Sequence, residues 1–426
     1  MKILFLNLPY KFEISRASRW PEKTKSGTQY YPYWICYAAG VCMNRGYDVE
    51  LVDCIAKKMT TEQTVQLVKN SAPDYVMGEI TTSTCAHDYE VLTAIKQENP
   101  GVKIIVGGTH ATVLSEQVLK ECMAIDVVAR QEYDFTLDEI MKNANDLSKV
   151  LGITYRAADG SIIHQPDRPW TEDLDELPMV SKVYEKFLNV NDYCYAFAQK
   201  PMVQIFSARG CPFHCNFCSY PESMSGRRFR RRSVKNFVDE LEYIHKHMPY
   251  IREIFIEDDT FTVDKKRVAE VCDEIKRRGL KLVWSCNTRA DTLDYETMAK
   301  MKEAGCRLLV VGYESGNQNV LDETRKGCLL YTSMVTIGNE MYYFEADGRL
   351  CRAAKEVTWN GKTYYVQSNG KVGANQWVTS GGNTYYYNAQ GQKVKGWLVT
   401  GGERYWLDAS TGALLKNCLL YTSRCV

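Results

Sequence analysis

Three cysteines in one short loop could do chemistry that no other part of this 426-residue chain suggests. Cys211, Cys215 and Cys218 follow the spacing C-x3-C-x2-C. Cysteine thiolates bind the irons of a [4Fe–4S] cluster, and most clusters of this type take four of them. Three thiolates leave one iron open, and an open iron can bind and reduce a small molecule. The spacing therefore predicts a reactive iron–sulfur site.

A structural zinc site is the alternative interpretation of these cysteines. Zinc prefers four ligands, often arranged as paired C-x2-C units. His214 could be the fourth ligand, but its position next to Cys215 makes tetrahedral closure awkward. We therefore favour the iron–sulfur interpretation.

The cysteine spacing, with the aromatic Phe217 just before the third cysteine, resembles the radical S-adenosylmethionine (radical SAM) family. The resemblance implies that the open iron chelates the amino and carboxylate groups of S-adenosylmethionine (SAM). One electron, from a donor such as flavodoxin or ferredoxin, then splits the sulfonium and releases a 5′-deoxyadenosyl radical. The resemblance also implies roles for residues at strand ends: Phe217 near the adenine, Glu257 and Asp258 at the methionine amino group, Ser285, Asn287 and Arg289 at the ribose or carboxylate, and Glu314 beside the nucleoside.

Strands and helices alternate along residues 1–150, which predicts a parallel sheet with helices on both faces. The expected strands are Lys2–Leu8, Asp48–Val52, Tyr75–Ile80, Lys103–Val106 and Ile125–Ala129. The expected helices are Tyr33–Asn44, Thr61–Asn70, Asp88–Gln97, Ser115–Cys122 and Phe135–Asn143. Ligands of such sheets bind at the carboxyl ends of the strands.

No G-x-G-x-x-G follows the first strand, so a dinucleotide site has little support. The domain instead resembles the cobalamin-binding domain of many radical SAM enzymes, through four short matches: Tyr31-Pro32, Gly46-Tyr47-Asp48-Val49, Gly107-Gly108-Thr109-His110 and Arg130…Glu132. This implies that Gly107 and Gly108 lie against the corrin and that His110 is a cofactor contact.

Two departures from the cobalamin-binding pattern leave alternatives open. The motif D-x-H-x-x-G is absent, so cobalt would be bound without a protein imidazole. The family's usual R-G-E-G-E reads Arg130-Gln131-Glu132-Tyr133-Asp134, which loses two glycines. A flavodoxin-like domain that holds no cobalamin is one alternative, and a His110 that only hydrogen-bonds a loop carbonyl is another.

Residues 151–200 connect this domain to a second one. A hairpin with its turn at Asp159-Gly160 is expected first, and Asp173-Leu174-Asp175-Glu176-Leu177-Pro178 resembles the D-L-D-x-L-P linker of the same enzymes. Residues 201–327 then predict half or more of a partial (β/α)6 barrel, truncated, with the cysteines after its first strand. Its expected strands are Met202–Ser207, Arg252–Glu257, Lys281–Cys286 and Arg307–Val311, and its helices are Val234–Met248, Lys265–Arg278 and Tyr295–Ala304.

A basic run spans residues 226–232, directly before Ser233, which could cap the next helix. Phosphate or RNA contact is one interpretation. A solvated loop is the interpretation we favour, because no other basic patch joins the run. The net charge of +1 also gives no electrostatic argument for nucleic acid or membrane binding, and no stretch is long and apolar enough to span a bilayer.

Residues 334–417 carry aromatic clusters about twenty residues apart, with glycines at turn positions. The pattern predicts stacked β-hairpins and resembles the cell-wall-binding repeats that bind choline or glucan. The alternative is that these rings only pack between repeats. Such modules act at the cell surface, whereas the unevenly spaced cysteines of residues 1–327, with one tight cluster, indicate a cytoplasmic protein for that part.

The hexapeptide Cys-Leu-Leu-Tyr-Thr-Ser occurs twice, at residues 328–333 and at the start of the segment 418–426. Both copies look like adaptor scars, so we expect a chimera of an enzyme fragment and an unrelated repeat protein.

For the enzyme we expect cobalamin-dependent methyl transfer to an unactivated carbon, or a radical cyclisation or rearrangement, on an unknown substrate. The competing hypothesis is a surface protein defined by its choline- or glucan-binding repeats.

Overall fold

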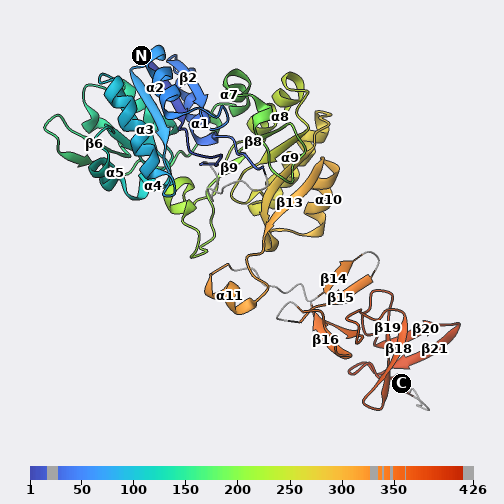
Figure 1. Cartoon of the computed structure of the whole chain (residues 1–426). Coiled ribbons are helices and arrows are strands. Elements are labelled where there is room, and N and C mark those ends of the chain that lie inside the picture. The colour runs from blue at the N-terminus through green and yellow to red at the C-terminus, as the bar shows by residue number, and fades with distance from the viewer. Residues whose placement is uncertain (17–26, 327–333, 338–339, 346–348, 360, 416–426) are drawn as a thin grey trace. The chain divides into compact units, whose positions relative to one another are not determined.

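The computed structural model describes residues 1–16, 27–326, 334–337, 340–345, 349–359 and 361–415 (Figure 1). Residues 1–312 form one compact unit and residues 313–426 form another. Both copies of the hexapeptide lie outside the described residues. Among the helices that are described, none has the length and apolar character needed to cross a bilayer.

The first unit contains a seven-stranded sheet in the order β2-β1-β3-β4-β5-β6-β7. The first five strands in this order are parallel, and β6 and β7 form the expected hairpin at the far edge. The strands are β1 (Lys2–Asn7), β2 (Asp48–Asp53), β3 (Tyr75–Glu79), β4 (Lys103–Gly107), β5 (Val127–Ala129), β6 (Ile153–Arg156) and β7 (Ile162–His164). The order 2-1-3-4-5 is that of flavodoxin-like folds, in which ligands bind where the strand order reverses, between β1 and β3.

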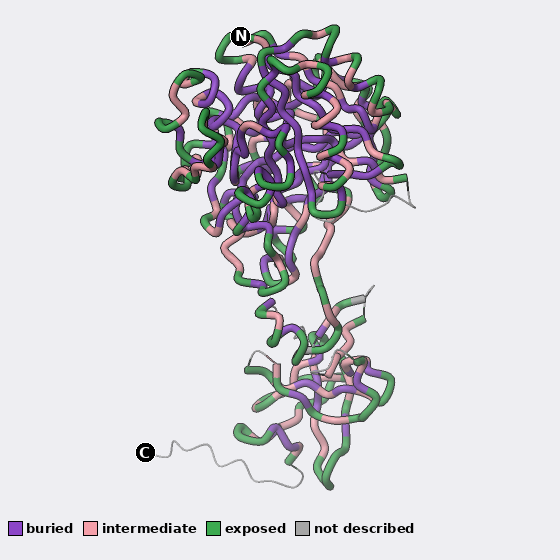
Figure 2. Tube along the Cα trace, turned by 60° about the vertical axis from the view of Figure 1, so that its left-hand side comes forward, coloured by how far each residue is buried: buried purple, intermediate pink, exposed green. Residues whose placement is uncertain are grey.

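Alternating side chains of β1 enter two separate cores, because successive residues of a strand point to opposite faces. Ile3 and Phe5 belong to the core beneath α1 (Tyr33–Asn44), α6 (Asp134–Lys142) and α7 (Val180–Phe187). Leu4 and Leu6 belong to the core beneath α2 (Thr61–Ser71), α3 (Cys85–Glu98), α4 (Thr109–Val113) and α5 (Ser115–Glu121). Figure 2 shows the buried residues gathered in the interior of this unit. The sheet is therefore covered on both faces, as predicted.

A second sheet has four parallel strands in the order β13-β12-β11-β8. Its strands are β8 (Met202–Ile205), β11 (Glu253–Ile256), β12 (Trp284–Arg289) and β13 (Cys306–Gly312), with helices α8 (Val234–His247), α9 (Lys265–Arg277) and α10 (Tyr295–Glu303) between them. Among the described residues, β13 pairs only with β12, and most of β13 is half-buried where β8 and β11 are fully buried. It thus has the character of an edge strand.

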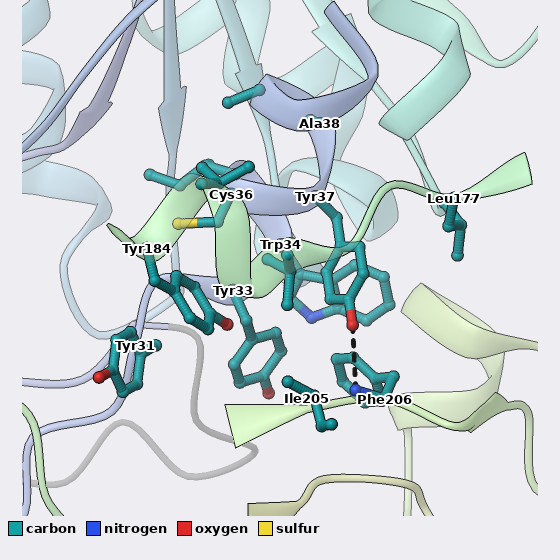
Figure 3. Close-up of a cluster of buried hydrophobic side chains, with 14 of the residues drawn as sticks. Tyr31, Tyr33, Trp34, Cys36, Tyr37, Ala38, Leu177, Tyr184, Ile205 and Phe206 are labelled. Carbon is teal, nitrogen blue, oxygen red and sulfur yellow. Dashed lines mark hydrogen bonds between the residues drawn. The ribbon is translucent and has the colours of Figure 1, made fainter. Parts of the chain in front are cut away.

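The amino-terminal half of α1 packs between the two sheets (Figure 3). The Tyr37 hydroxyl accepts a hydrogen bond from the Phe206 backbone N–H at 3.0 Å, just after β8. The Trp34 indole N–H donates to the Tyr220 hydroxyl at 2.8 Å, and Tyr31 donates to the Met202 carbonyl at 2.8 Å. Each aromatic ring thus finds a partner for its polar group, which permits burial. The two sheets consequently share one core.

Two buried ion pairs also join the sheets. Arg209 donates two hydrogen bonds to Asp134, at 2.7 and 3.1 Å, and Arg230 donates two to Glu132, both at 2.7 Å. All four side chains are at least 95% buried. Glu132 and Asp134 follow β5, so the carboxyl end of the first sheet holds both arginines.

The second unit begins with α11 (Gln318–Glu323) and continues as four antiparallel hairpins, as predicted. Their strands are β14 (Met334–Ile337), β15 (Glu340–Tyr343), β16 (Lys355–Trp359), β17 (Lys362–Val366), β18 (Gln376–Ser380), β19 (Asn383–Tyr387), β20 (Gly396–Thr400) and β21 (Glu403–Leu407). The last two hairpins turn at Gly381-Gly382 and Gly401-Gly402, where positive φ angles favour glycine.

Most expected elements agree with the structure to within a few residues at each end. The third barrel strand is an exception, because β12 begins at Trp284 instead of Lys281 and continues to Arg289. Short helix α4 also forms directly after Gly108, where the sequence predicted only a loop.

We expect Asp134→Ala to destabilise the protein by about 3–5 kcal/mol, because the change leaves the buried Arg209 guanidinium without its main counter-charge. Urea unfolding of the full chain measures the loss. Asp146→Ala is the control, since Asp146 and Lys149 form an exposed pair at 3.0 Å, and exposed pairs contribute little to stability. Equal effects of the two changes would contradict this account of the pair.

Candidate functional site

The three cysteines lie on one long loop, residues 210–229, which we call the cysteine loop. Its two ends are joined by a short antiparallel pair, β9 (Ala208–Arg209) with β10 (Arg230–Arg231). Gly210 has φ +92°, and a Cβ there would lie 2.0 Å from the Arg228 carbonyl oxygen, so only glycine fits. The loop therefore begins and ends at fixed points next to the carboxyl end of β8.

The described cysteines are all free thiols, and Cys215 is the most deeply buried of the three in the loop. No group of three His, Cys, Asp or Glu side chains among the described residues is arranged to hold a single metal ion. His214 is exposed. A cubane cluster differs from a single-ion site, because each thiolate binds a different iron.

Asp258 holds the backbone that leads into the cysteine loop. Its carboxylate accepts hydrogen bonds from the Ser207 N–H at 2.6 Å, the Ser207 hydroxyl at 2.5 Å and the Ala208 N–H at 3.0 Å. Arg267 donates to the Ser207 hydroxyl and carbonyl at 3.0 Å each. Burial raises the pKa of Asp258, and Arg267 and the Ser207 hydrogen bonds oppose that rise. Both Asp258 oxygens are thus engaged in positioning the loop, whereas the sequence suggested a contact to the methionine amino group.

Glu257 and Asn287 lie at neighbouring strand ends beside this loop. Glu257 Oε2 accepts hydrogen bonds from the Tyr195 hydroxyl at 2.5 Å and from Gln204 Nε2 at 3.0 Å. The Asn287 amide, half-exposed on β12, donates to the Asp258 carbonyl at 3.3 Å. The carboxyl ends of parallel strands share one edge of the sheet, which brings these polar groups together.

Arg289, the last residue of β12, reaches the cysteine loop itself. Its Nη1 lies 3.4 Å from Cys215 Sγ, and its guanidinium carbon lies 3.7 Å from the centroid of the Phe213 ring. Asp291 accepts hydrogen bonds from Nε and Nη2 at 2.9 and 2.8 Å. Burial alone would lower the pKa of Arg289, but the hydrogen bonds and charge of Asp291 raise it overall.

Of the three other predicted site residues, only Ser285 is shown to lie away from this group. Ser285 is fully buried, and its hydroxyl donates to the Glu253 carboxylate at 2.6 Å. Glu253 is the first residue of β11, so this contact lies toward the amino end of the strands. The later start of β12 explains this difference. Phe217 is 41% exposed. Glu314 belongs to the second unit, where it has φ +62° and pairs with Lys326 at 2.8 Å.

Part of the basic run is solvated, as predicted, because Arg228 and Arg231 are exposed and Arg227 is half-buried. Arg230 and Arg232 are buried, which corrects our prediction for these two residues. Each arginine of the run forms an ion pair with a carboxylate: Arg227 with Glu222, Arg228 with Glu172, Arg230 with Glu132, Arg231 with Asp264 and Arg232 with Glu240. Ser233 caps α8 as predicted, accepting from the Asn236 N–H at 3.1 Å.

Gly107 is the last residue of β4, and Gly108 follows it. Other side chains occupy the space where a Cβ would lie on either glycine. A Cβ on Gly107 would be 2.8 Å from the Tyr133 ring, and one on Gly108 would be 2.8 Å from Glu79 Cγ. Both glycines therefore serve internal packing, because a Cβ at either position would clash with Tyr133 or Glu79. Gln131, at a position where the family has glycine, keeps a left-handed φ of +58°.

Each ring nitrogen of His110 lies near a hydroxyl group at the carboxyl edge of the first sheet. Nδ1 lies 3.1 Å from the Thr82 hydroxyl, and Nε2 lies 3.5 Å from the Tyr89 hydroxyl. Burial lowers the pKa of His110, which favours the neutral ring. These contacts support a loop-bonding histidine, although its partners are hydroxyls and not the carbonyl that we considered.

The carboxyl edge between β1 and β3 contains buried polar groups without partners. Glu79 is 4% exposed, and its carboxylate has no hydrogen bond to any described residue. The Tyr133 hydroxyl and Arg16 Nε are likewise buried without a partner in the described parts of the chain, although Arg16 also pairs with Asp88 at 2.5 Å. Burial raises the pKa of Glu79 from 4.5 to about 7, and Arg16 opposes the rise. Groups of this kind fit a ligand that is rich in amides.

A hollow of about 450 Å³ opens at the same edge, at the ends of β1 and β2. Tyr10, Phe12, Cys54, Lys58 and His87 are among its lining residues. Helix α4 contacts the turn Pro221–Ser225 of the cysteine loop, so the edge of the first sheet and the cysteine loop lie side by side.

Comparison with known proteins now identifies the family. The model of the B12-binding domain matches residues 23–141, and that of the Radical SAM superfamily matches residues 205–332. An uncharacterized methyltransferase of Pyrococcus horikoshii is 32% identical over 330 residues, covering 77% of this chain and 68% of that protein. The chain belongs to the radical SAM superfamily, in the branch that carries a B12-binding domain. The family implies a [4Fe–4S] cluster and SAM as cofactors, together with cobalamin.

Two further similarities extend this result. An anaerobic magnesium-protoporphyrin IX monomethyl ester cyclase of Rubrivivax gelatinosus is 29% identical over 336 residues, covering 76% of this chain and 58% of the cyclase. The cobalamin-dependent radical SAM enzyme OxsB, solved with aqua-cobalamin and SAM, has the same fold with a TM-score of 0.60 and 19% identity. That likeness covers 77% of this chain and 46% of OxsB. The chain thus spans between about half and two thirds of the length of these relatives.

In the repeat part, a choline-binding repeat model matches residues 374–418.

Several residues that build the site were not identified from the sequence. Arg209, Asp134 and Arg267 hold the loop through contacts distant in the chain, and no local pattern marks them. Asp291 could have been found, because a carboxylate two residues after an arginine can bind its guanidinium. Glu79 ends a predicted strand, but its burial depends on tertiary packing.

We expect Glu79→Gln to remove a pH-dependent loss of stability. A carboxyl whose pKa is about 7 when folded and 4.5 when unfolded favours the folded state below pH 4.5, and this contribution is lost as pH rises through 7. The parent should therefore lose about 3 kcal/mol from this group between pH 4.5 and 8. Urea unfolding at a series of pH values measures the difference. Glu98→Gln, on an exposed side chain, is the control, and equal pH profiles for parent and Glu79→Gln would refute the assignment.

Proposed function

We propose that the enzyme part of this chain transfers a methyl group to an unactivated carbon of a small molecule, using SAM and cobalamin. Radical cyclisation is the next candidate, since one relative is a cyclase. The observation that carries the proposal is the convergence of the cysteine loop with Glu257, Asn287 and Arg289 at one sheet edge. Reduction would be supplied by a flavodoxin or ferredoxin.

Each residue at the barrel edge has a proposed task in binding. Cys211, Cys215 and Cys218 would hold the cluster. Glu257, fixed by Tyr195 and Gln204, would accept a hydrogen bond from the amino group of SAM. The half-exposed Asn287 would hold the ribose or the carboxylate, and Phe217, exposed in the loop, is free to cover the adenine. Glu314 remains proposed at the nucleoside. Asp258 acts on the loop backbone and Ser285 lies with Glu253, so neither is part of the proposed SAM contacts.

The edge of the first sheet would hold cobalamin. Glu79, Tyr133 and Arg16 offer polar atoms that no described residue satisfies, and the amide side chains of a corrin could pair with them. Gly107, Gly108 and His110 shape this edge through packing and hydrogen bonds. When bound, the cluster supplies one electron to SAM and cobalamin carries the methyl group. The protein's part is to keep the two sites side by side and fixed.

Cys215→Ala should abolish cluster binding without preventing cobalamin binding. After anaerobic reconstitution with iron and sulfide, the parent should show absorbance at about 400 nm and should cleave SAM when reduced. The variant should lose both, because a cluster held by two thiolates is poorly retained, but it should still bind hydroxocobalamin in gel filtration. Iron content, absorbance and SAM cleavage measure the outcome.

Cys85→Ala serves as the control, because Cys85 is a partly exposed thiol outside the loop. It should assemble the cluster and cleave SAM like the parent. A Cys215→Ala protein with the parent's cluster absorbance would refute the radical SAM assignment, and a parent that binds no cobalamin would refute the cobalamin part alone.

Choline binding by the second unit is a separate function that one observation favours. The Trp377 ring lies 5.0 Å from the Tyr386 ring and 4.9 Å from the Tyr405 ring, at angles of 63° and 69°. Two tyrosine rings thus meet the Trp377 ring edge to face, and clustered aromatic rings are the kind of group that binds quaternary ammonium ions. A neighbouring ring, Tyr385, is already covered by the Lys393 ammonium, 3.6 Å from its centroid.

Trp377→Ala should weaken binding of the full chain to choline about tenfold, because cation–π contacts of this kind contribute about 1–2 kcal/mol each. Retention on a choline-bearing resin and the concentration of free choline needed for elution measure the change. Tyr250→Ala, an exposed aromatic of the first unit, is the matched control. If the parent passes through the resin unretained, the repeats do not bind choline.

A further inference from the structure

We propose that Arg289 hydrogen-bonds the Cys215 thiolate of the bound cluster and thereby raises the cluster's reduction potential. This inference rests on the proposed function, since it requires that Cys215 binds the cluster. It assigns Arg289 as a positioning residue of the redox site, which differs from the role in ribose or carboxylate binding that the sequence suggested.

The guanidinium of Arg289 is fixed on three sides. Its Nη1 points to Cys215 Sγ at 3.4 Å, within the range of a hydrogen bond to sulfur. Its other two nitrogens, Nε and Nη2, donate to the two oxygens of Asp291. Its flat face rests on the Phe213 ring at 3.7 Å, and Phe213 itself belongs to the cysteine loop. The orientation of the Arg289 side chain is therefore set by its contacts with the cysteine loop and with Asp291.

Burial makes this contact stronger than a surface contact would be. Arg289 is 4% exposed and Cys215 is 7% exposed. A hydrogen bond between a guanidinium and a thiolate is charge-assisted, and such bonds are about twice as strong as neutral ones. Water screens a buried pair less than an exposed one, so the charge of Arg289, although partly offset by Asp291, still acts on the sulfur.

The direction of the effect follows from charge. Reduction adds one electron to the cluster and its thiolates, and Arg289 keeps all its protons during this step. A positive hydrogen-bond donor stabilises the more negative, reduced form, and hydrogen bonds to the sulfurs are known to set the potentials of such clusters. Arg289 therefore makes the electron easier to accept.

The test is anaerobic potentiometry of the reconstituted full chain, followed by electron paramagnetic resonance of the reduced cluster with dithionite as the reductant. Arg289→Gln should lower the midpoint potential, so that the ratio of reduced to oxidised cluster at a fixed potential falls about tenfold, or about 59 mV for a one-electron couple. Arg289→Lys keeps the charge but loses the planar contact with Phe213 and Asp291, and it should give a smaller shift in the same direction.

Arg278→Gln is the matched control. Arg278 also binds carboxylates through its guanidinium, at Asp239, Glu242 and Glu274, but it follows α9 at the opposite end of the barrel. Its substitution should leave the midpoint potential of the cluster unaltered.

Equal potentials for the parent and for Arg289→Gln, at equal iron content, would overturn the inference and leave the proposed function intact. If Arg289→Gln retains too little iron to measure, an Arg289→Lys protein with the parent's potential would overturn it. A parent that assembles no cluster would instead refute the proposed function.

Discussion

The position of the cysteine loop depends on two buried ion pairs at its ends. Arg209 precedes the loop and Arg230 follows it, and the two are direct partners in the pair of β9 with β10. Like charges placed opposite each other repel, so this arrangement is stable only because Asp134 and Glu132 neutralise both arginines with two hydrogen bonds each. Both carboxylates follow β5 of the first sheet. The loop is therefore fixed to the sheet that belongs to the B12-binding domain, and not only to the barrel strand from which it starts.

Buried ion pairs contribute little net stability, because desolvation cancels much of the attraction, but removing one partner is costly. Such pairs are suited to fixing the position of the cysteine loop relative to the first sheet. In this unit they are joined by three aromatic side chains: Tyr31, just before α1, bonds to β8, Trp34 bonds to the cysteine loop, and Tyr37 bonds to Phe206 after β8. A reaction that uses two cofactors on two sheets requires those sheets to keep one separation. Polar contacts with defined directions provide that constraint better than apolar packing alone, which tolerates sliding.

The sequence predicted the strands and helices of the enzyme part well, because hydrophobic periodicity and glycine stops are local signals. It predicted the cysteine loop and the polar residues at strand ends for the same reason. It was wrong where the answer depends on distant contacts. Arg230 and Arg232 read as part of a solvated basic run, yet their carboxylate partners lie on other elements. Ser285 was placed at a strand end, yet β12 begins three residues later than expected, and Ser285 lies at its second residue. A shift of a few residues is enough to move a side chain from a site to the core.

Charge balance distinguishes the two cofactor edges. At the barrel edge the buried carboxylates have partners: Asp258 lies with Arg267, Asp291 binds Arg289, and Glu257 accepts hydrogen bonds from Tyr195 and Gln204. Glu79 at the edge of the first sheet is different, because Arg16, which pairs with Asp88, is the charge that acts on it, and burial raises its pKa to about 7. An unsatisfied carboxyl is a cost that folding alone does not explain, since a glutamine or leucine would avoid it. The cost is understandable if a ligand completes its hydrogen bonds. The buried carboxyl of Glu79 thus lies at the carboxyl end of β3, beside the position between β1 and β3 where strand order alone predicts that a ligand binds.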